Sequence, residues 1–176
     1  TVWVSSESVL VELSDADREI IQNYKPNKFV IADLGASKYE INGHEYLFGV
    51  DIFNNINDAL SKSSEYDVIY VFAGEYELFS DIRKSVTILG PNADKGSQEE
   101  RNEEALVTIF YDQVDTLAAN VRFNGLSLNG NNEPTDTGIY FQCRVGTEEF
   151  TLESCIINHG NTFIKVVSGS DMTINV

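Results

Sequence analysis

The side chains best suited to hold a metal ion lie in one stretch, "NGNNEPTDTG", at residues 129–138. Asn131, Asn132, Glu133 and Asp136 offer amide and carboxylate oxygens, which are the ligands that calcium prefers. Their spacing does not match an EF-hand loop, and Gly, Asn, Asp and Pro are also the residues of ordinary turns. The stretch is a calcium candidate, with a plain solvated turn as the favoured interpretation.

The histidines and cysteines do not form a ligand set. His44 stands beside an Asn42-Gly43 turn signal and His159 follows another expected turn, and neither has a cysteine or carboxylate at a metal-ligand spacing. Cys143 and Cys155 match no zinc pattern and are too few for a disulfide framework. No cofactor is therefore expected beyond the calcium candidate.

The composition limits the partners. The 176 residues include 12 basic and 28 acidic side chains, which give a net charge of −16 spread along the chain. Such a surface repels phosphate backbones, so we expect no nucleic-acid partner. No run approaches the roughly 18 apolar residues of a membrane helix, so we expect no membrane insertion. The length suits one domain.

Five pentapeptides share apolar side chains at their second and fourth positions. They are "DVIYV" from residue 67, "SVTIL" from 85, "NVRFN" from 120, "EFTLE" from 149 and "DMTIN" from 171. Their variable spacing suits coils that keep their strands and vary their loops. An antiparallel sandwich also uses many short strands, but it does not explain why the copies align in the same chain direction.

Two copies extend further. "VRFNGLSLN" from Val121 and "FTLESCIIN" from Phe150 align without a gap, and each reads as two strands around a bend. A third strand follows in each, "GIYFQC" at 138–143 and "TFIKVV" at 162–167, so that Cys143 matches Val167. Cys155 matches Leu126, which places the two thiols on different sides of the coil as free cysteines.

Asn129 and Asn158 end the aligned stretches at equivalent positions. Stacked asparagines hydrogen-bond up a stack of coils, but asparagine is also an ordinary turn residue. Both interpretations stay open at this stage.

The run from residue 48 to 92 carries a family resemblance. Its signals are Gly74 and Tyr76 in a "G-x-Y" turn, followed by Lys84, Val86, Thr87, Ile88 and Gly90 in a "K-x-V-T-I-x-G" strand. It resembles the entry into right-handed parallel β-helix proteins of the pectin-lyase-like superfamily, and with the later coils the resemblance covers about residues 46–176. It implies an all-β, right-handed, single-stranded parallel β-helix with an N-terminal cap.

Residues 1–50 are predicted to be that cap. Strands are expected at 1–4 and 28–32, a hairpin at 38–49 and a short helix from Ser14. Residues 51–176 are predicted to hold a capping helix, begun by Asp51 with Ile52, Phe53 and Ile56 on one face, and then the first coils. Because 171–176 begin a coil with one strand, we expect further coils or another chain at the C-terminal edge.

The resemblance implies two classes of function. Enzymes of the superfamily act on acidic polysaccharides, but no paired aspartates lie on an expected coil strand, and "SCIINHGNTF" lacks the Gln-Asp-Thr run of the esterases. The favoured hypothesis is a non-enzymatic surface or secreted module for adhesion or for binding carbohydrate or a host surface. The alternative is the N-terminal part of a polysaccharide lyase, hydrolase or esterase whose catalytic coils lie outside this chain. An extracellular or cell-surface location follows from the resemblance alone.

Aromatic side chains are the candidate sugar-stacking groups. They are Tyr66, Tyr70, Tyr76, Phe79, Tyr111, Tyr140 and Phe141. Packing in the core and rim is the favoured role, because aromatic residues serve β-structures generally.

Overall fold

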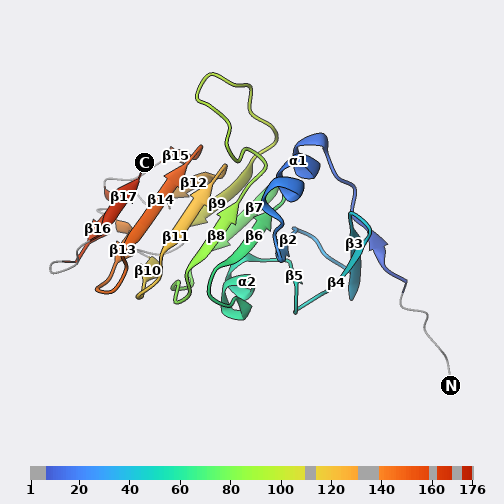
Figure 1. Ribbon diagram of the computed structural model, residues 1–176, viewed down its shortest axis with the longest axis horizontal. Coiled ribbons are helices and arrows are strands. Elements are labelled where there is room, and N and C mark those ends of the chain that lie inside the picture. Colours follow the sequence, from blue (N-terminus) through green and yellow to red (C-terminus); the bar gives the residue numbers. More distant parts are fainter. Residues whose placement is uncertain (1–6, 110–113, 131–138, 159–161, 168–171, 176) are drawn as a thin grey trace.

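The computed structural model describes residues 7–109, 114–130, 139–158, 162–167 and 172–175. In this part of the chain, short strands follow one another in chain order along the longest axis of the molecule, with the N-terminal hairpin at one end (Figure 1). Strands that are equivalent in successive coils lie side by side and pair in parallel. The predicted parallel β-helix is confirmed.

The longest face, here called sheet 1, has seven described strands. In spatial order these are β5 (Ile52–Phe53), β2 (Lys28–Val30), β6 (Asp67–Val71), β8 (Val86–Leu89), β11 (Val121–Asn124), β14 (Glu149–Glu153) and β17 (Thr173–Asn175). The five pentapeptides of the sequence repeat supply the last five of these strands. Each pair of neighbours is parallel. Equivalent side chains of successive coils therefore pack against one another.

Two shorter faces complete each coil. Sheet 2 consists of β7 (Gly74–Leu78), β9 (Ala105–Ile109), β12 (Ser127–Gly130) and β15 (Ile156–Asn158), and sheet 3 of β10 (Val114–Thr116), β13 (Ile139–Cys143) and β16 (Thr162–Val166). All their described pairings are parallel. The coils β8–β9–β10, β11–β12–β13 and β14–β15–β16 each have three strands, as predicted.

The register of sheets 1 and 2 is as predicted. Val121 pairs with Phe150 and Leu128 with Ile157. In sheet 3 the predicted register is wrong by one residue, because Cys143 pairs with Val166 and not with Val167.

The physical reason lies in which side chains point inward. The observed register places Phe141 beside Ile164 and Gln142 beside Lys165. Apolar groups thus stack inside the coil and polar groups outside, whereas a shift of one residue would set a lysine beside a buried phenylalanine.

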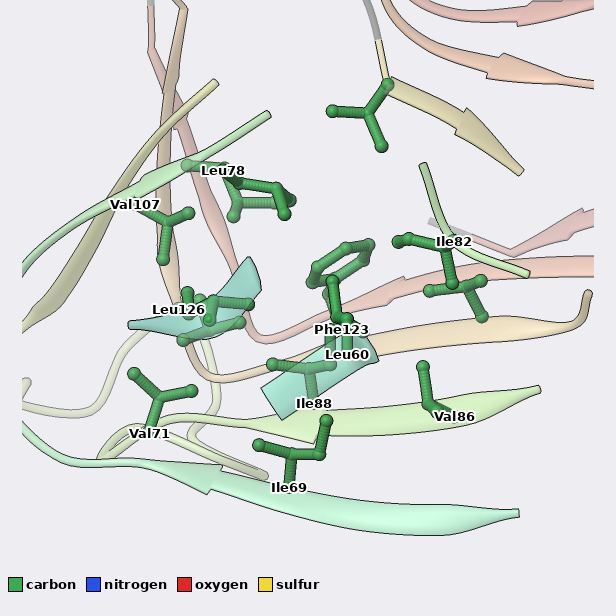
Figure 2. Close-up of a cluster of buried hydrophobic side chains, with 14 of the residues drawn as sticks. Leu60, Ile69, Val71, Leu78, Ile82, Val86, Ile88, Val107, Phe123 and Leu126 are labelled. Atoms are coloured by element: carbon green, nitrogen blue, oxygen red, sulfur yellow. The ribbon is translucent and has the colours of Figure 1, made fainter. Parts of the chain in front are cut away.

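The main core fills the interior of the coils. Ile69, Ile88 and Phe123 lie on successive strands of sheet 1 and point inward one above another (Figure 2). Phe141 and Phe150 continue the stack, with ring centroids 5.2 Å apart. Cys143 is buried in this core, while Cys155 is half-buried at the bend between β14 and β15, and both are free thiols.

Helix α2 (Ile56–Lys62) packs against β2, β5 and β7 and adds Ile56, Ala59 and Leu60 to the main core. The prediction that Asp51 begins this helix is wrong. Asn55 is the N-cap, and its side-chain oxygen accepts a hydrogen bond from the Asp58 N–H at 2.8 Å. Residues 52 and 53 are held instead as β5 by parallel pairing with β2.

A second core covers the outer face of sheet 1 at its N-terminal strands, β5, β2, β6 and β8. Helix α1 (Asp15–Tyr24) packs Ile20 and Ile21 over Phe29, Tyr70 and Leu89 of that sheet. The short helix predicted from Ser14 is present. Ser14 is its N-cap, and Ser14 and Asp17 exchange hydrogen bonds in a capping box.

The predicted hairpin is also present. Strands β3 (Lys38–Ile41) and β4 (His44–Leu47) pair antiparallel around Asn42 and Gly43, and β1 (Val9–Leu10) pairs in parallel with β3. The strand predicted at 1–4 lies outside the described residues.

Candidate functional site

A cleft lies where α2 packs beside the outer face of sheet 2. Its volume is about 840 Å³. It is lined mainly by amide, carboxylate and hydroxyl side chains, with aromatic and aliphatic groups among them: Asn54, Asn55, Asn57, Asp58, Ser61, Glu75, Tyr76, Glu77, Phe79, Ser80, Leu106 and Thr108.

The floor of the cleft follows from strand alternation. In β7, Tyr76 and Leu78 point into the main core, so Glu75 and Glu77 must point outward. The parallel register places Glu77 beside Thr108 of β9. Outward side chains of neighbouring strands therefore form rows across the face, and two of these rows, Glu75 with Leu106 and Glu77 with Thr108, line the cleft.

The second of these rows continues along sheet 2 as a polar ladder. Thr108 pairs with Asn129, and Asn129 with Asn158. Asn158 Nδ2 donates to Asn129 Oδ1 at 3.1 Å, so the stacked-asparagine interpretation is confirmed. A line of hydrogen-bonding groups thus leads from the cleft toward the C-terminal end of the stack.

Asn57 fixes the wall of the cleft. It is only 7 % exposed, and its amide makes three hydrogen bonds: Nδ2 donates to the Glu77 carbonyl at 3.0 Å, and Oδ1 accepts from the N–H groups of Phe79 and Ser80 at 3.0 and 3.1 Å. The turn after β7 is thereby tied to α2. As a consequence Phe79, which is 51 % exposed, is held at the rim on a rigid support.

Tyr76 supports the cleft from behind. Its hydroxyl accepts from the Ala32 N–H at 3.1 Å and donates to the Phe72 carbonyl at 2.9 Å. Burial raises the pKa of Tyr76 to about 12, so the phenol stays neutral. The tyrosine of the predicted "G-x-Y" turn is thus a structural residue.

The lining suits the binding of a hydroxylated ligand. Carboxylates accept hydrogen bonds, amides both donate and accept them, and the Phe79 ring offers an apolar face. Among the described lining residues none is basic, so the cleft disfavours an anionic ligand.

A second polar cluster joins α1, sheet 1 and the loop at 90–104. Tyr24 Oη donates to the Asp94 carboxylate at 2.6 Å, and Asn124 Nδ2 donates to the same carboxylate at 2.8 Å while Asn124 Oδ1 accepts from the Asp94 N–H at 2.9 Å. Burial, and then the Asp94 carboxylate, raise the pKa of Tyr24. These groups satisfy one another, so the cluster pins the loop to the sheet.

The predicted site residues have different outcomes. The calcium candidates Asn131, Asn132, Glu133 and Asp136 lie outside the described residues, as does His159. His44 is exposed on β4. Across the described ranges, no group of three or more His, Cys, Asp or Glu side chains is arranged to hold a metal ion.

Most of the aromatic candidates whose side chains are described lie in the cores. Tyr70, Tyr76 and Phe141 are buried, whereas Tyr66 and Phe79 are exposed. The two exposed rings line separate cavities. Tyr111 lies outside the described residues, and the Tyr140 side chain is likewise not among the described groups.

The sequence predicts Phe79 as a sugar-stacking candidate but does not indicate the residue that positions it. In the run "NNIND" at 54–58, the apolar position predicts one face of a helix and gives the asparagines no role. The buried amide of Asn57 could not be found from that pattern, because its three partners lie some 20 residues further along the chain.

No helix in the described ranges has the length and apolar character to cross a membrane. Comparison with protein-family models, with curated proteins and with solved structures finds no match. The architecture of the described residues is that of a mainly β protein with three stacked, all-parallel sheets and a small N-terminal sheet.

Proposed function

We propose that this chain is a non-enzymatic carbohydrate-binding module of the pectin-lyase-like β-helix type, and that a neutral glycan binds in the cleft between α2 and sheet 2. The observation that carries the proposal is the lining of this cleft, in which carboxylates and amides surround a half-exposed phenylalanine. The family resemblance supports a secreted or cell-surface location and a role in adhesion.

The chemistry of the lining matches that of a sugar. Sugar hydroxyls donate to carboxylates such as Glu75, Glu77 and Asp58, and the Asn54 amide can both donate to and accept from them. The Phe79 ring packs against the apolar C–H face of a sugar ring. Asn57 already holds the turn that carries Phe79 in place. The entropic cost of ordering this turn when a ligand binds is therefore small.

Charge selects the glycan class. The chain carries a net charge of −16, and the described lining of the cleft holds three carboxylates and no basic group. Uronic-acid polymers are therefore repelled. A neutral glycan meets no such barrier.

Isothermal titration with named oligosaccharides tests the proposal. Cellohexaose, xylohexaose, mannohexaose and maltohexaose are the neutral probes, and hexagalacturonate is the acidic one. We expect at least one neutral probe to bind with a dissociation constant near or below about 1 mM, which corresponds to about −4 kcal/mol. Hexagalacturonate should bind more weakly than the best neutral probe.

Phe79→Ala is the matched variant. It should weaken binding about tenfold, since the lost ring contact is worth about 1.4 kcal/mol. Phe48→Ala is the control, because Phe48 is similarly exposed at 42 % but lies outside the cleft. Failure of all four neutral probes to bind, or equal losses in the two variants, would refute the proposal.

A further inference from the structure

We infer that the outer face of sheet 1 carries a second, separate groove that binds one extended neutral polysaccharide chain along the axis of the β-helix. The groove consists of two cavities of about 280 and 400 Å³, which share Arg122, Glu149 and Thr151 among their lining residues. One reaches Tyr66 and the other reaches Asn175. The two cavities therefore form one path across the strands, longer than either.

The parallel register arranges the groove as a regular row. Thr87 pairs with Arg122, Arg122 with Thr151, and Thr151 with Asn175. Successive strands lie about 4.8 Å apart, so a hydroxyl, guanidinium or amide group recurs at that interval along the axis. A regular row of this kind suits a ligand that itself repeats, and the apolar lining residues Val86 and Val121 point away into the main core.

The polar groups of the groove are already oriented by one another. Glu149 Oε1 accepts from Asn175 Nδ2 at 2.9 Å and from Thr151 Oγ1 at 3.2 Å. Arg122 Nε donates to Glu153 Oε2 at 3.0 Å, and its guanidinium lies 5.9 Å from the centroid of the Tyr24 ring. A ligand therefore meets fixed side chains, which lowers the entropic cost of binding.

Tyr66 marks one end of the groove. It is 82 % exposed and adopts a left-handed backbone conformation with φ of 67°, which is costly for an aromatic residue. The conformation is fixed by a hydrogen bond from the Tyr66 N–H to the Ser85 carbonyl. Strain of this kind is concentrated at binding sites, and here it presents a ring on which a sugar can stack.

The charges favour a neutral chain. Glu149 and Glu153 border the groove, and Arg122 is the basic residue in its described lining. The Arg122 guanidinium already pairs with Glu153. The carboxylate of a uronic acid would therefore compete with Glu153 for this guanidinium. No residue is shared with the cleft on sheet 2, so the two sites can be tested separately.

The test is an amide NMR titration with the neutral oligosaccharides cellohexaose, xylohexaose, mannohexaose and maltohexaose, in the wild-type chain and two variants. At least one probe should shift the amides of residues 85–87, 120–122 and 149–151. Tyr66→Ala should weaken this response about tenfold and leave the response around Phe79 unchanged. Thr87→Val, which removes only a hydroxyl, should also weaken it, and melting curves identify any loss of folding.

Chain length gives a second readout. Because the groove spans several strands, the best hexasaccharide should bind it at least tenfold more tightly than the corresponding disaccharide. The inference is overturned if none of the probes shifts these amides, if Tyr66→Ala leaves the response intact, or if length has no effect. Amide shifts around Phe79 alone would support the cleft and contradict the groove. Amide shifts at the groove alone would support the groove and contradict the cleft.

Discussion

The bend between β11 and β12 depends on Gly125, and replacing it by alanine should destabilise the protein strongly. Gly125 has φ of 80°, in the left-handed region. A methyl group built there would stand 2.5 Å from Ala93 Cα and closer still to the backbone atoms of Asn92 and Ala93. The loop at 90–104 would have to leave the bend, together with the hydrogen bond from the Asn92 N–H to the Gly125 carbonyl.

The magnitude has two parts. Left-handed backbone costs alanine about 1–2 kcal/mol, and overpacking adds about 1–3 kcal/mol or more, because the obstacle is backbone. Gly125→Ala should therefore cost about 2–5 kcal/mol, out of a typical stability of about 5–15 kcal/mol.

Gly43→Ala is the matched control for this prediction. Gly43 has nearly the same φ of 81°, but nothing lies within 4 Å of its added methyl group, so only the first part of the cost applies. Thermal unfolding followed by circular dichroism measures both variants, and each kcal/mol should lower Tm by about 2–4 °C. Equal losses in the two variants would show that the loop does not press on the bend.

Other variants test further contacts. Tyr70→Phe should cost about 1–3 kcal/mol in thermal unfolding, because the buried Tyr70 hydroxyl hydrogen-bonds the buried Asp17 carboxylate; a loss below about 0.5 kcal/mol would contradict this. For Asp67, burial acts to raise the pKa, but hydrogen bonds from Lys28, Ser64 and Asn27 outweigh it and hold the pKa below its usual value. Its stabilisation is therefore complete above the unfolded pKa of about 3.9 and is lost as pH falls toward the folded pKa, so Asp67→Asn should flatten the acid limb of a stability–pH curve, and an unchanged limb would refute the pairing. Burial raises the pKa of both cysteine thiols, so iodoacetamide without reductant should label them slowly in the folded protein and fully in urea, as mass spectrometry can measure; a disulfide-linked product would contradict the placement of the thiols.

The main architecture could be predicted because it depends on a local signal that repeats. Apolar side chains alternate in each of the five pentapeptides, and Val121 and Phe150 begin stretches that align without a gap. Local alternation fixes which side chains point inward, and the repeat fixes which strands become neighbours. Both depend on residues close together in the sequence.

The parts that could not be predicted depend on contacts between distant residues. The second core forms because α1 covers Tyr70 and Leu89, far along the chain, and nothing local to the helix indicates which face it covers. Phe53 lay at helical spacing but was held in a strand by pairing with β2. In sheet 3 the apolar character of both strands allowed two registers, and packing against Phe141 selected one.

Intermolecular NOEs test most directly whether the cleft between α2 and sheet 2 binds a neutral glycan. The sample is the wild-type chain with the tightest-binding of the four neutral hexasaccharides. We predict NOEs from the Phe79 ring protons to sugar C–H protons, together with amide shifts at Ser80 and Thr108. A bound hexasaccharide that gives neither the ring NOEs nor these shifts would contradict the assignment of the site.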